Sequence, residues 1–259
     1  MPRLNLTTLN LTTLFALLTA MALAADKPAF EVASVKAASP QGSWIVRQHG
    51  GPGRADPDGP DPTRWSVENY KLVDIVAKAY AVEPYLISSP TPLEERFSIQ
   101  AKLPAGTTPA QFLLMIQSLL EDRFHFRAHR QTRDVRAYEL AVAKDGPKFQ
   151  ALAAGEVPSR SGGMTAEAGR SVWRDPRCTM ERLRSMLARS LHAPVADRTG
   201  LTGTYDLELT WATEGRPLAE DPWPVRAALR DQLGLTLRGV QAPVETLVVD
   251  HVDRAPTGN

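Results

Sequence analysis

The feature that most constrains the fold is a repeat of the chain's own apolar pattern. Trp173 lies 108 positions after Trp65, and this shift places apolar residues on apolar residues without a gap up to residue 99. The pairs include Leu72/Met180, Ile75/Leu183, Ala79/Leu187, Ile87/Val195, Leu93/Leu201, Phe97/Tyr205 and Ile99/Leu207. The shift then becomes 109 for Leu120/Leu229, Asp122/Asp231, Phe124/Leu233 and Phe126/Leu235, and 107 for Leu140/Leu247 and Val142/Val249. Internal similarity at a fixed period indicates a repeated supersecondary unit.

Each copy predicts the same order of elements. Apolar residues recur at helical spacing after Leu72 and again after Met180, whereas residues 97–102 and 205–211 alternate as strands. Thr108 and Pro109 are typical of a helix start, and a matching helix is expected near residues 223–233. Short strands are expected at 65–67, 85–88, 124–128, 138–143, 235–237 and 246–251, with a charged hairpin turn at 131–136. The predicted fold is α+β: two units of roughly βαββαββ order, with sheets half covered by helices.

The regions around the copies differ in composition. The first unit is predicted at residues 63–150 and the second at 171–256. Residues 25–62 combine an alternating strand at 30–36 with a loop rich in glycine and proline. Residues 151–170 are small and polar, which predicts a linker.

Residues 1–24 have the composition of a secretory signal peptide. Arg3 precedes an apolar run from about residue 11 to 23, and Ala22-Leu23-Ala24 supplies a small-x-small cleavage site. The run is short for a membrane span, which needs roughly 20 residues. We therefore expect cleavage after Ala24, no transmembrane segment in the mature chain, and a periplasmic or secreted location.

Charge and cysteine content narrow the class of the mature protein. The full chain has 30 basic and 29 acidic residues. Cleavage of the signal peptide would remove one of them, Arg3, so the mature chain would have 29 of each sign. A balanced chain has no general electrostatic attraction for nucleic acid. Cys178 is the only cysteine, so the chain forms no internal disulfide, and an exported protein of this kind depends on its core.

The stretch DRTGLTGTYD at residues 197–206 is a candidate functional loop, because it places acidic, basic and hydroxyl side chains close to two glycines. In the first copy the equivalent stretch is SPTPLEERF at 89–97, in which Ser89, Pro90, Pro92 and Glu95 stand at the positions of Asp197, Arg198, Gly200 and Gly203. What persists is a threonine, a core leucine and an inward aromatic. This comparison favours a structural turn, in which the fold depends on Leu93, Phe97, Gly200, Leu201, Gly203 and Tyr205. Asp197, Arg198 and Thr199 remain candidates for a binding surface specific to the second copy.

Other residues that could carry chemistry lack a motif. His125 and His129 would lie about 13 Å apart on a strand, too far to share one ion, so no metal site is predicted. No nucleophile elbow, zinc-protease, phosphate-loop or dinucleotide motif occurs, and neither a catalytic constellation nor a cofactor is expected. One alternative is a hydrolase with a site between the two units that uses Asp197, His192 and Ser190.

Several stretches together resemble a known family. They are FEVASVK, WSVENYKLVDIVAKAYAV, ERFSIQAKLPAG, PVADRTGLTGTYDLELTW and APVETLVVDHV. The chain is similar to a soil-associated, largely acidobacterial family of exported proteins of unknown function. That resemblance implies export and assigns no catalytic residue. Each half also resembles the short N-terminal domain of secretins and TonB-dependent receptors, which are periplasmic docking modules.

These observations lead to one preferred hypothesis and two alternatives. Export, duplication and the lack of a catalytic motif favour a non-catalytic binding or sensing module, whose partner would be another envelope protein. Exposed strand edges in such a unit can recruit a strand from a partner. The alternatives are the hydrolase and a passive envelope scaffold. The sequence leaves the oligomeric state open.

Overall fold

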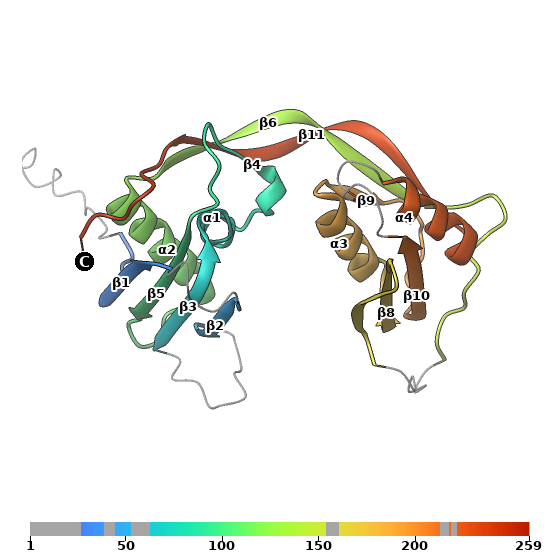
Figure 1. Ribbon diagram of the computed structural model, residues 1–259, viewed down its shortest axis with the longest axis horizontal. Helices are drawn as coiled ribbons and strands as arrows, with labels where there is room; N and C mark the ends of the chain where they lie inside the picture. The colour runs from blue at the N-terminus through green and yellow to red at the C-terminus, as the bar shows by residue number, and fades with distance from the viewer. Residues whose placement is uncertain are drawn as a thin grey trace, which may run out of the picture. The chain divides into compact units, whose positions relative to one another are not determined.

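The computed structural model describes residues 27–38, 45–52, 63–153, 161–212, 218 and 222–258 (Figure 1). The predicted signal peptide and most of the glycine- and proline-rich loop lie outside these residues. The chain forms two compact units. The first contains Met1–Tyr70, Arg96–Phe124 and Ala255–Asn259, and the second contains Lys71–Glu95 and His125–Arg254. The second unit therefore combines residues from both predicted copies.

The described part of the first unit is a four-stranded sheet with one long helix. The strands lie in the order β1-β5-β3-β2, with bounds Val32–Ala37, Arg96–Lys102, Arg64–Lys71 and Arg47–Gly50. Helix α2, Pro109–Phe124, packs on the sheet through aromatic side chains. Trp65 contacts Phe112 at a ring distance of 5.2 Å, and Phe97 contacts Phe124 at 5.0 Å.

Helix α2 begins where the sequence predicts. The backbone N–H of Thr108 donates to Gln111 Oε1 at 3.0 Å, and the N–H of Gln111 donates to Thr108 Oγ1 at 3.3 Å. This reciprocal arrangement is a capping box, which satisfies donors that the first helical turn leaves unpaired. Pro109 follows at the first helical position, where its missing N–H costs no hydrogen bond.

In its described residues, the second unit contains two sheets and three α-helices. One sheet has the order β10-β8-β7, with bounds Tyr205–Ala212, Arg170–Cys178 and Gly163–Glu167. The other has the order β4-β11-β6-β9, with bounds Ile87–Ser88, Leu235–His251, Arg127–Val142 and Val195–Asp197. The helices are α1 (Leu72–Tyr80), α3 (Met180–Leu191) and α4 (Trp223–Ala228), and α4 continues as a π-helical turn at Leu229–Leu233. A short 3-10 turn at Pro84–Leu86 precedes β4.

Strands β6 and β11 form a long two-stranded ribbon, and the predicted hairpin turn at residues 131–136 is wrong. The two strands pair antiparallel from Leu235↔Val142 to His251↔Arg127, so each continues through the segment expected to turn. The polar composition of 131–136 has a different cause. This part of the ribbon is mostly exposed, and its charges pair across strands, as in the contact of Arg130 Nη1 with Glu245 Oε1 at 2.5 Å.

Each short strand of the ribbon sheet joins the long strand of the other half of the chain. Strand β4 runs parallel to β11, with Ile87 opposite Leu247, and β9 runs parallel to β6, with Val195 opposite Tyr138. The observed order from β3 to β6 is β-α-β-β-α-β, and the order from β8 to β11 is the same. The fold is mixed α/β with open sheets, comprising eleven strands and four α-helices within the described residues.

The predicted linker at 151–170 contains a strand, which corrects that prediction. Strand β7 pairs with β8 from Gly163↔Arg174 to Glu167↔Arg170. The two residues between them, Ala168 and Gly169, have φ of 45° and 77°. Two successive residues with positive φ form the tight hairpin turn that suits the twist of paired strands. Within the described part of the predicted linker, residues 163–169 therefore form an edge strand and a hairpin turn.

Helix α3 covers the core of the second unit. The helix begins at Thr179, whose Oγ1 accepts from the N–H of Arg182 at 3.3 Å, and it ends at His192 in the left-handed conformation. Its buried face joins a cluster that includes Cys178, Leu183, Leu187, Leu207, Leu209, Leu229 and Leu235. No helix in the described part of the chain is long and apolar enough to span a membrane.

Candidate functional site

The loop after β9 uses its polar side chains to form the turn. Asp197 Oδ1 accepts from the N–H of Thr199 at 2.8 Å and from its hydroxyl at 2.7 Å. Thr199 Oγ1 in turn accepts from the N–H of Leu201 at 3.2 Å. Hydrogen bonds from Asp and Thr side chains to nearby backbone are a standard way of fixing turns. Two of the three predicted binding residues, Asp197 and Thr199, are therefore occupied by the loop itself.

Arg198 is the member of that set that extends away from the turn. Its side chain is 67% exposed, and its Nε lies 3.7 Å from Oε1 of Glu139 on β6. Glu139 also contacts Arg238 on β11, whose Nη2 lies 2.5 Å from its Oε2. The hydrogen bond from Arg238 is the main reason that the pKa of Glu139 is lowered, and the charge of Arg198 adds to it. Arg198 thus belongs to an exposed ion-pair group on the ribbon.

The six residues predicted to be structural lie in or beside the two cores. Leu93, Phe97 and Tyr205 are buried, and Leu201 packs against the core of the second unit. Gly200 has φ of 69°, as expected for a turn glycine. Gly203, unlike Gly200, has no positive φ. It is needed for space, because a Cβ there would lie 2.8 Å from Tyr205 Oη.

The hydrolase alternative gains no support from the contacts of its three residues. Ser190 Oγ lies 3.7 Å from the sulfur of Met186, its neighbour one turn back on α3. His192 ends α3, and Asp197 accepts hydrogen bonds from Thr199. Within the described residues, no hydrogen bond links any two of Ser190, His192 and Asp197. A nucleophile, base and orienting acid normally lie within hydrogen-bond reach of one another.

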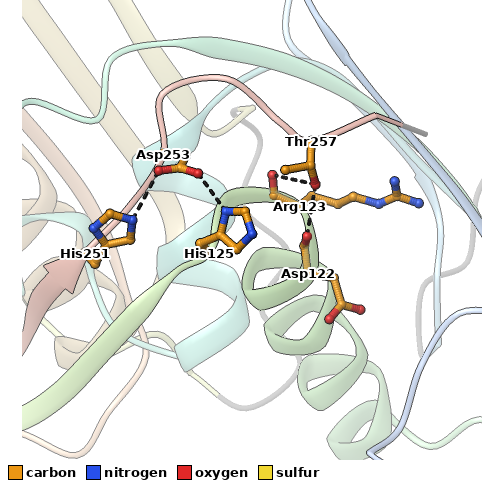
Figure 2. Close-up of polar contacts among 6 residues, drawn as sticks. All are labelled: Asp122, Arg123, His125, His251, Asp253 and Thr257. Carbon is orange, nitrogen blue, oxygen red and sulfur yellow. Dashed lines mark hydrogen bonds and ion pairs between the residues drawn. The ribbon is translucent and has the colours of Figure 1, made fainter.

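Sequence reasoning missed a histidine–aspartate cluster near the ends of β6 and β11 (Figure 2). Asp253 lies between two imidazoles: its Oδ2 is 2.6 Å from His125 Nδ1, and its Oδ1 is 3.1 Å from His251 Nε2. The hydrogen bond with His125 is the largest cause of a lowered pKa at Asp253. His129 pairs separately with Asp250, with Nδ1 at 3.0 Å from both carboxylate oxygens.

His125 has an unusual backbone conformation for a residue with a side chain. Its φ is 46°, and the residue 109 positions later is Gly234, with φ of 64°. Histidine is one of the non-glycine residues that occupy this region more often than most. The side chains involved are about half exposed. Within the part of the chain that the structure describes, no three His, Cys, Asp or Glu side chains form a group that could hold a metal ion.

The C-terminal residues are fixed to helix α2 by a separate set of contacts, also drawn in Figure 2. The N–H of Thr257 donates to the carbonyl of Arg123 at 2.8 Å, and its hydroxyl donates to the carbonyl of Asp122 at 3.1 Å. The last carbonyls of a helix have no partner within the helix. Thr257 therefore serves as a cap for α2, and its hydroxyl is engaged in that structural role.

A groove on the β10-β8-β7 sheet is the second feature that the sequence did not reveal. It has a volume of about 650 Å³ and runs between β7 and α3. Its lining includes Met164 of β7, Trp173 and Arg174 of β8, and Arg182, Met186 and Arg189 of α3. Residues 182, 186 and 189 recur at intervals of four and three, so they share one face of the helix. This spacing was visible in the sequence, but the strand opposite it was not.

Ion pairs hold two of the three arginines of the groove. Arg182 Nε donates to Asp175 Oδ2 at 2.6 Å, and Arg174 Nε donates to Glu208 Oε2 at 2.9 Å. Asp175 is only 4% exposed, and its other oxygen accepts from the N–H of Arg177 at 3.2 Å. A buried carboxylate requires such compensation. Arg189 has no ion-pair partner among the described residues. The groove therefore carries a positive charge that Asp175, the carboxylate in its lining, does not cancel.

The model of a family described as a protein of unknown function, DUF3738, matches residues 73–252. The chain belongs to the DUF3738 family. The matched region contains α1 apart from its first residue, all of α2, α3 and α4, the groove, and strands β4 to β11. No curated protein and no solved structure matches this chain.

Proposed function

We propose that this DUF3738 protein is an exported, non-catalytic binding module of the cell envelope that recruits another envelope protein through the open edge of β7. The observation that carries the proposal is an asymmetry in the β10-β8-β7 sheet. One edge of this sheet is closed by the chain itself, and beyond the other edge, which borders a groove, the described residues place no strand.

The closed edge is that of β10. The side-chain amide of Gln232 accepts from the N–H of Thr210 at 3.0 Å and donates to its carbonyl at 2.7 Å, as a neighbouring strand would. At the start of β10, Ala151 forms a bridge with Tyr205, and the N–H of Leu152 donates to the carbonyl of Thr204 at 2.8 Å. Covering an edge in this way is a recognised protection against unwanted strand pairing.

The open edge is that of β7, beyond which the described part of the chain places no strand. Glu167 and Arg170 flank the two-residue turn, so they form a hydrogen-bonded pair, and pairs along an antiparallel ladder alternate. Met164 and Ala166 therefore direct their backbone groups away from β8. An extended segment of a partner can pair with these groups and place alternate side chains toward the groove.

We further propose that the two βαββαβ halves are copies of one unit, which supports a docking role like that of the domain they resemble. Trp65 and Trp173 are buried in β3 and β8, and Leu72 and Met180 begin α1 and α3. The short strands β4 and β9 contain the pair Ile87 and Val195. Superposition of residues 65–103 on 173–211 tests the proposal, which fails if these pairs occupy different places.

Export is the premise of an envelope partner, and it is tested first. The intact mass of the protein purified from the envelope or medium of its host is expected to match a chain that begins at Ala25. A chain that retains Met1, or one found only in the cytoplasm, would remove the premise.

The edge itself is tested by capture of a partner from envelope extract, with residues 25–259 as bait. Ala166→Pro removes the outward N–H without breaking the bonds to β8, and Ala166→Ser is the matched control that keeps this N–H. We expect the parent and Ala166→Ser to retain the same protein and Ala166→Pro to lose it, while all three melt cooperatively. Equal capture by Ala166→Pro, or no capture by any of the three, contradicts the proposal.

A further inference from the structure

The groove beside β7 has a chemistry that restricts which partner segment it can accept. We infer that the segment is an extended acidic peptide, with its acidic side chains at alternate positions on the face toward α3. This inference rests on the proposed function and adds the chemical class of the ligand.

The shape of the groove suits a strand. Residues two apart on a strand share one face and are separated by about 6.7 Å. Met164 lines the groove, so a strand paired with β7 presents every second side chain to the same space. The opposite wall is helix α3, on which Arg182 and Arg189 are seven residues apart, or about 10.5 Å along the axis. Two same-face side chains of an extended peptide fall within the reach of these two long arginines.

The charges of the groove favour carboxylates. The titratable groups that line it are Arg174, Arg182, Arg189 and Asp175. The hydrogen bonds of Arg174 and Arg182 to carboxylates both go through Nε, so the Nη groups of each guanidinium remain for a further acceptor. Arg189 is exposed and has no ion-pair partner in the described residues. Guanidinium groups bind carboxylates with paired, charge-assisted hydrogen bonds.

The floor of the groove is apolar and explains why a peptide is favoured over a small anion. Trp173 and Met186 are 8% and 4% exposed, and Met164 at the rim is 51% exposed. An exposed methionine beside a buried aromatic offers contact to an apolar side chain as well as to charge. A peptide that alternates acidic and apolar side chains can use the arginines, this floor and the open backbone of β7 together.

The test is selection of a phage-displayed library of random 12-residue peptides on residues 25–259. We expect the enriched peptides to be rich in Asp and Glu at alternate positions. Arg189→Gln should weaken their affinity about fivefold, because a partly exposed charged contact is lost. Arg230→Gln is the matched control: it removes the same charge from an exposed arginine outside the groove and should leave the affinity unchanged.

Three results would overturn the inference: no enrichment, enrichment of neutral or basic peptides, or equal binding of acidic peptides by Arg189→Gln. Added dipeptides of glutamate that displace the peptides completely would assign the site to small carboxylates instead. The partner capture above separates this failure from failure of the proposed function. Capture that depends on Ala166 but not on Arg189 would leave the docking edge in place and reject the acidic segment.

Discussion

Tyr205 is the residue on which the conspicuous loop depends. It is 5% exposed, its ring lies edge-on to Phe149 at 5.0 Å, and its hydroxyl accepts from the N–H of Gly203 at 3.0 Å. Removal of a large buried aromatic side chain costs roughly 3–5 kcal/mol. We therefore expect Tyr205→Ala to lower the free energy of unfolding by about that amount in urea titrations.

Two further variants separate the contribution of the Tyr205 ring to stability from those of its hydroxyl and of the Arg198 ion pair. Tyr205→Phe keeps the ring and should cost only about 1 kcal/mol, the contribution of one hydrogen bond. Arg198→Gln removes an exposed, long ion pair and should leave the melting temperature nearly unchanged. A loss of stability in Arg198→Gln as large as that in Tyr205→Ala would contradict the claim that this loop is held by the packing of Tyr205 and not by the charge of Arg198.

The histidine–aspartate cluster gives stability a specific dependence on pH. The pKa of Asp253 is lowered from its ordinary value of 3.8, mainly by the hydrogen bond from His125. A carboxylate with a lowered pKa in the folded state stabilises the fold above its unfolded pKa, and this stabilisation is lost as pH falls through the folded pKa. Asp253→Asn should therefore melt below the parent near pH 5, and the difference should shrink once the pH falls below about 3.8 and disappear below the folded pKa. Melting curves across this range measure the difference, and a gap that persists at low pH would contradict it.

Among the secondary-structure elements, periodicity predicted those that have one buried face. Helices α1, α2 and α3 and strands β5 and β10 lie where the apolar spacing places them, because each has one face in a core. The ribbon was missed because residues 131–136 pair with a partner strand while remaining solvated. Such a segment has the composition of a turn and no apolar alternation.

The candidate sites were missed for a related reason. The His–Asp cluster joins His125 to residues 251 and 253, which only the pairing of β6 with β11 brings together. The groove lies between Arg182 and Arg189 of α3, whose spacing can be read from the sequence, and strand β7. The small, polar residues of β7 led to the prediction of a linker, so this wall of the groove could not be predicted. Single residues with local roles, such as Asp197 and Thr199, could be assigned to a turn because their partners are two residues away.

The side-chain amide of Gln232 covers the edge of β10, and we expect its removal to expose that edge. Gln232→Ala frees the N–H and carbonyl of Thr210, which are then available to a strand of another molecule. We expect this variant to self-associate at concentrations at which the parent stays monodisperse in light scattering. Gln241→Ala, which shortens an exposed side chain on β11, is the control and should behave as the parent. Identical scattering of Gln232→Ala and the parent would show that the amide does not protect the edge.

For the whole molecule, the exchange of short strands predicts that neither half folds alone. Strand β4 precedes β6 in the chain but pairs with β11, and β9 pairs with β6. The ribbon also joins the two halves through sixteen residue pairs. A chain that ends at residue 150 loses the strands that pair with β6 and β4, and a chain that begins at 151 loses the strands that pair with β11 and β9. Each then exposes a long unpaired strand, which is an unfavourable edge.

We therefore expect residues 25–150 and residues 151–259, expressed separately, to lack a cooperative thermal transition. Mixed in equal amounts from denaturant, they should regain one, because the ribbon and both parallel pairs can form between two chains. Circular dichroism follows the transition, and size-exclusion chromatography reports whether the restored species contains one of each fragment. The informative variant is Ala137→Pro in the N-terminal fragment, which introduces a proline into the buried part of β6 opposite Val240. It removes an N–H from the ribbon and should prevent recovery. Fragments that melt cooperatively on their own would show that each half holds its core without the exchanged strands.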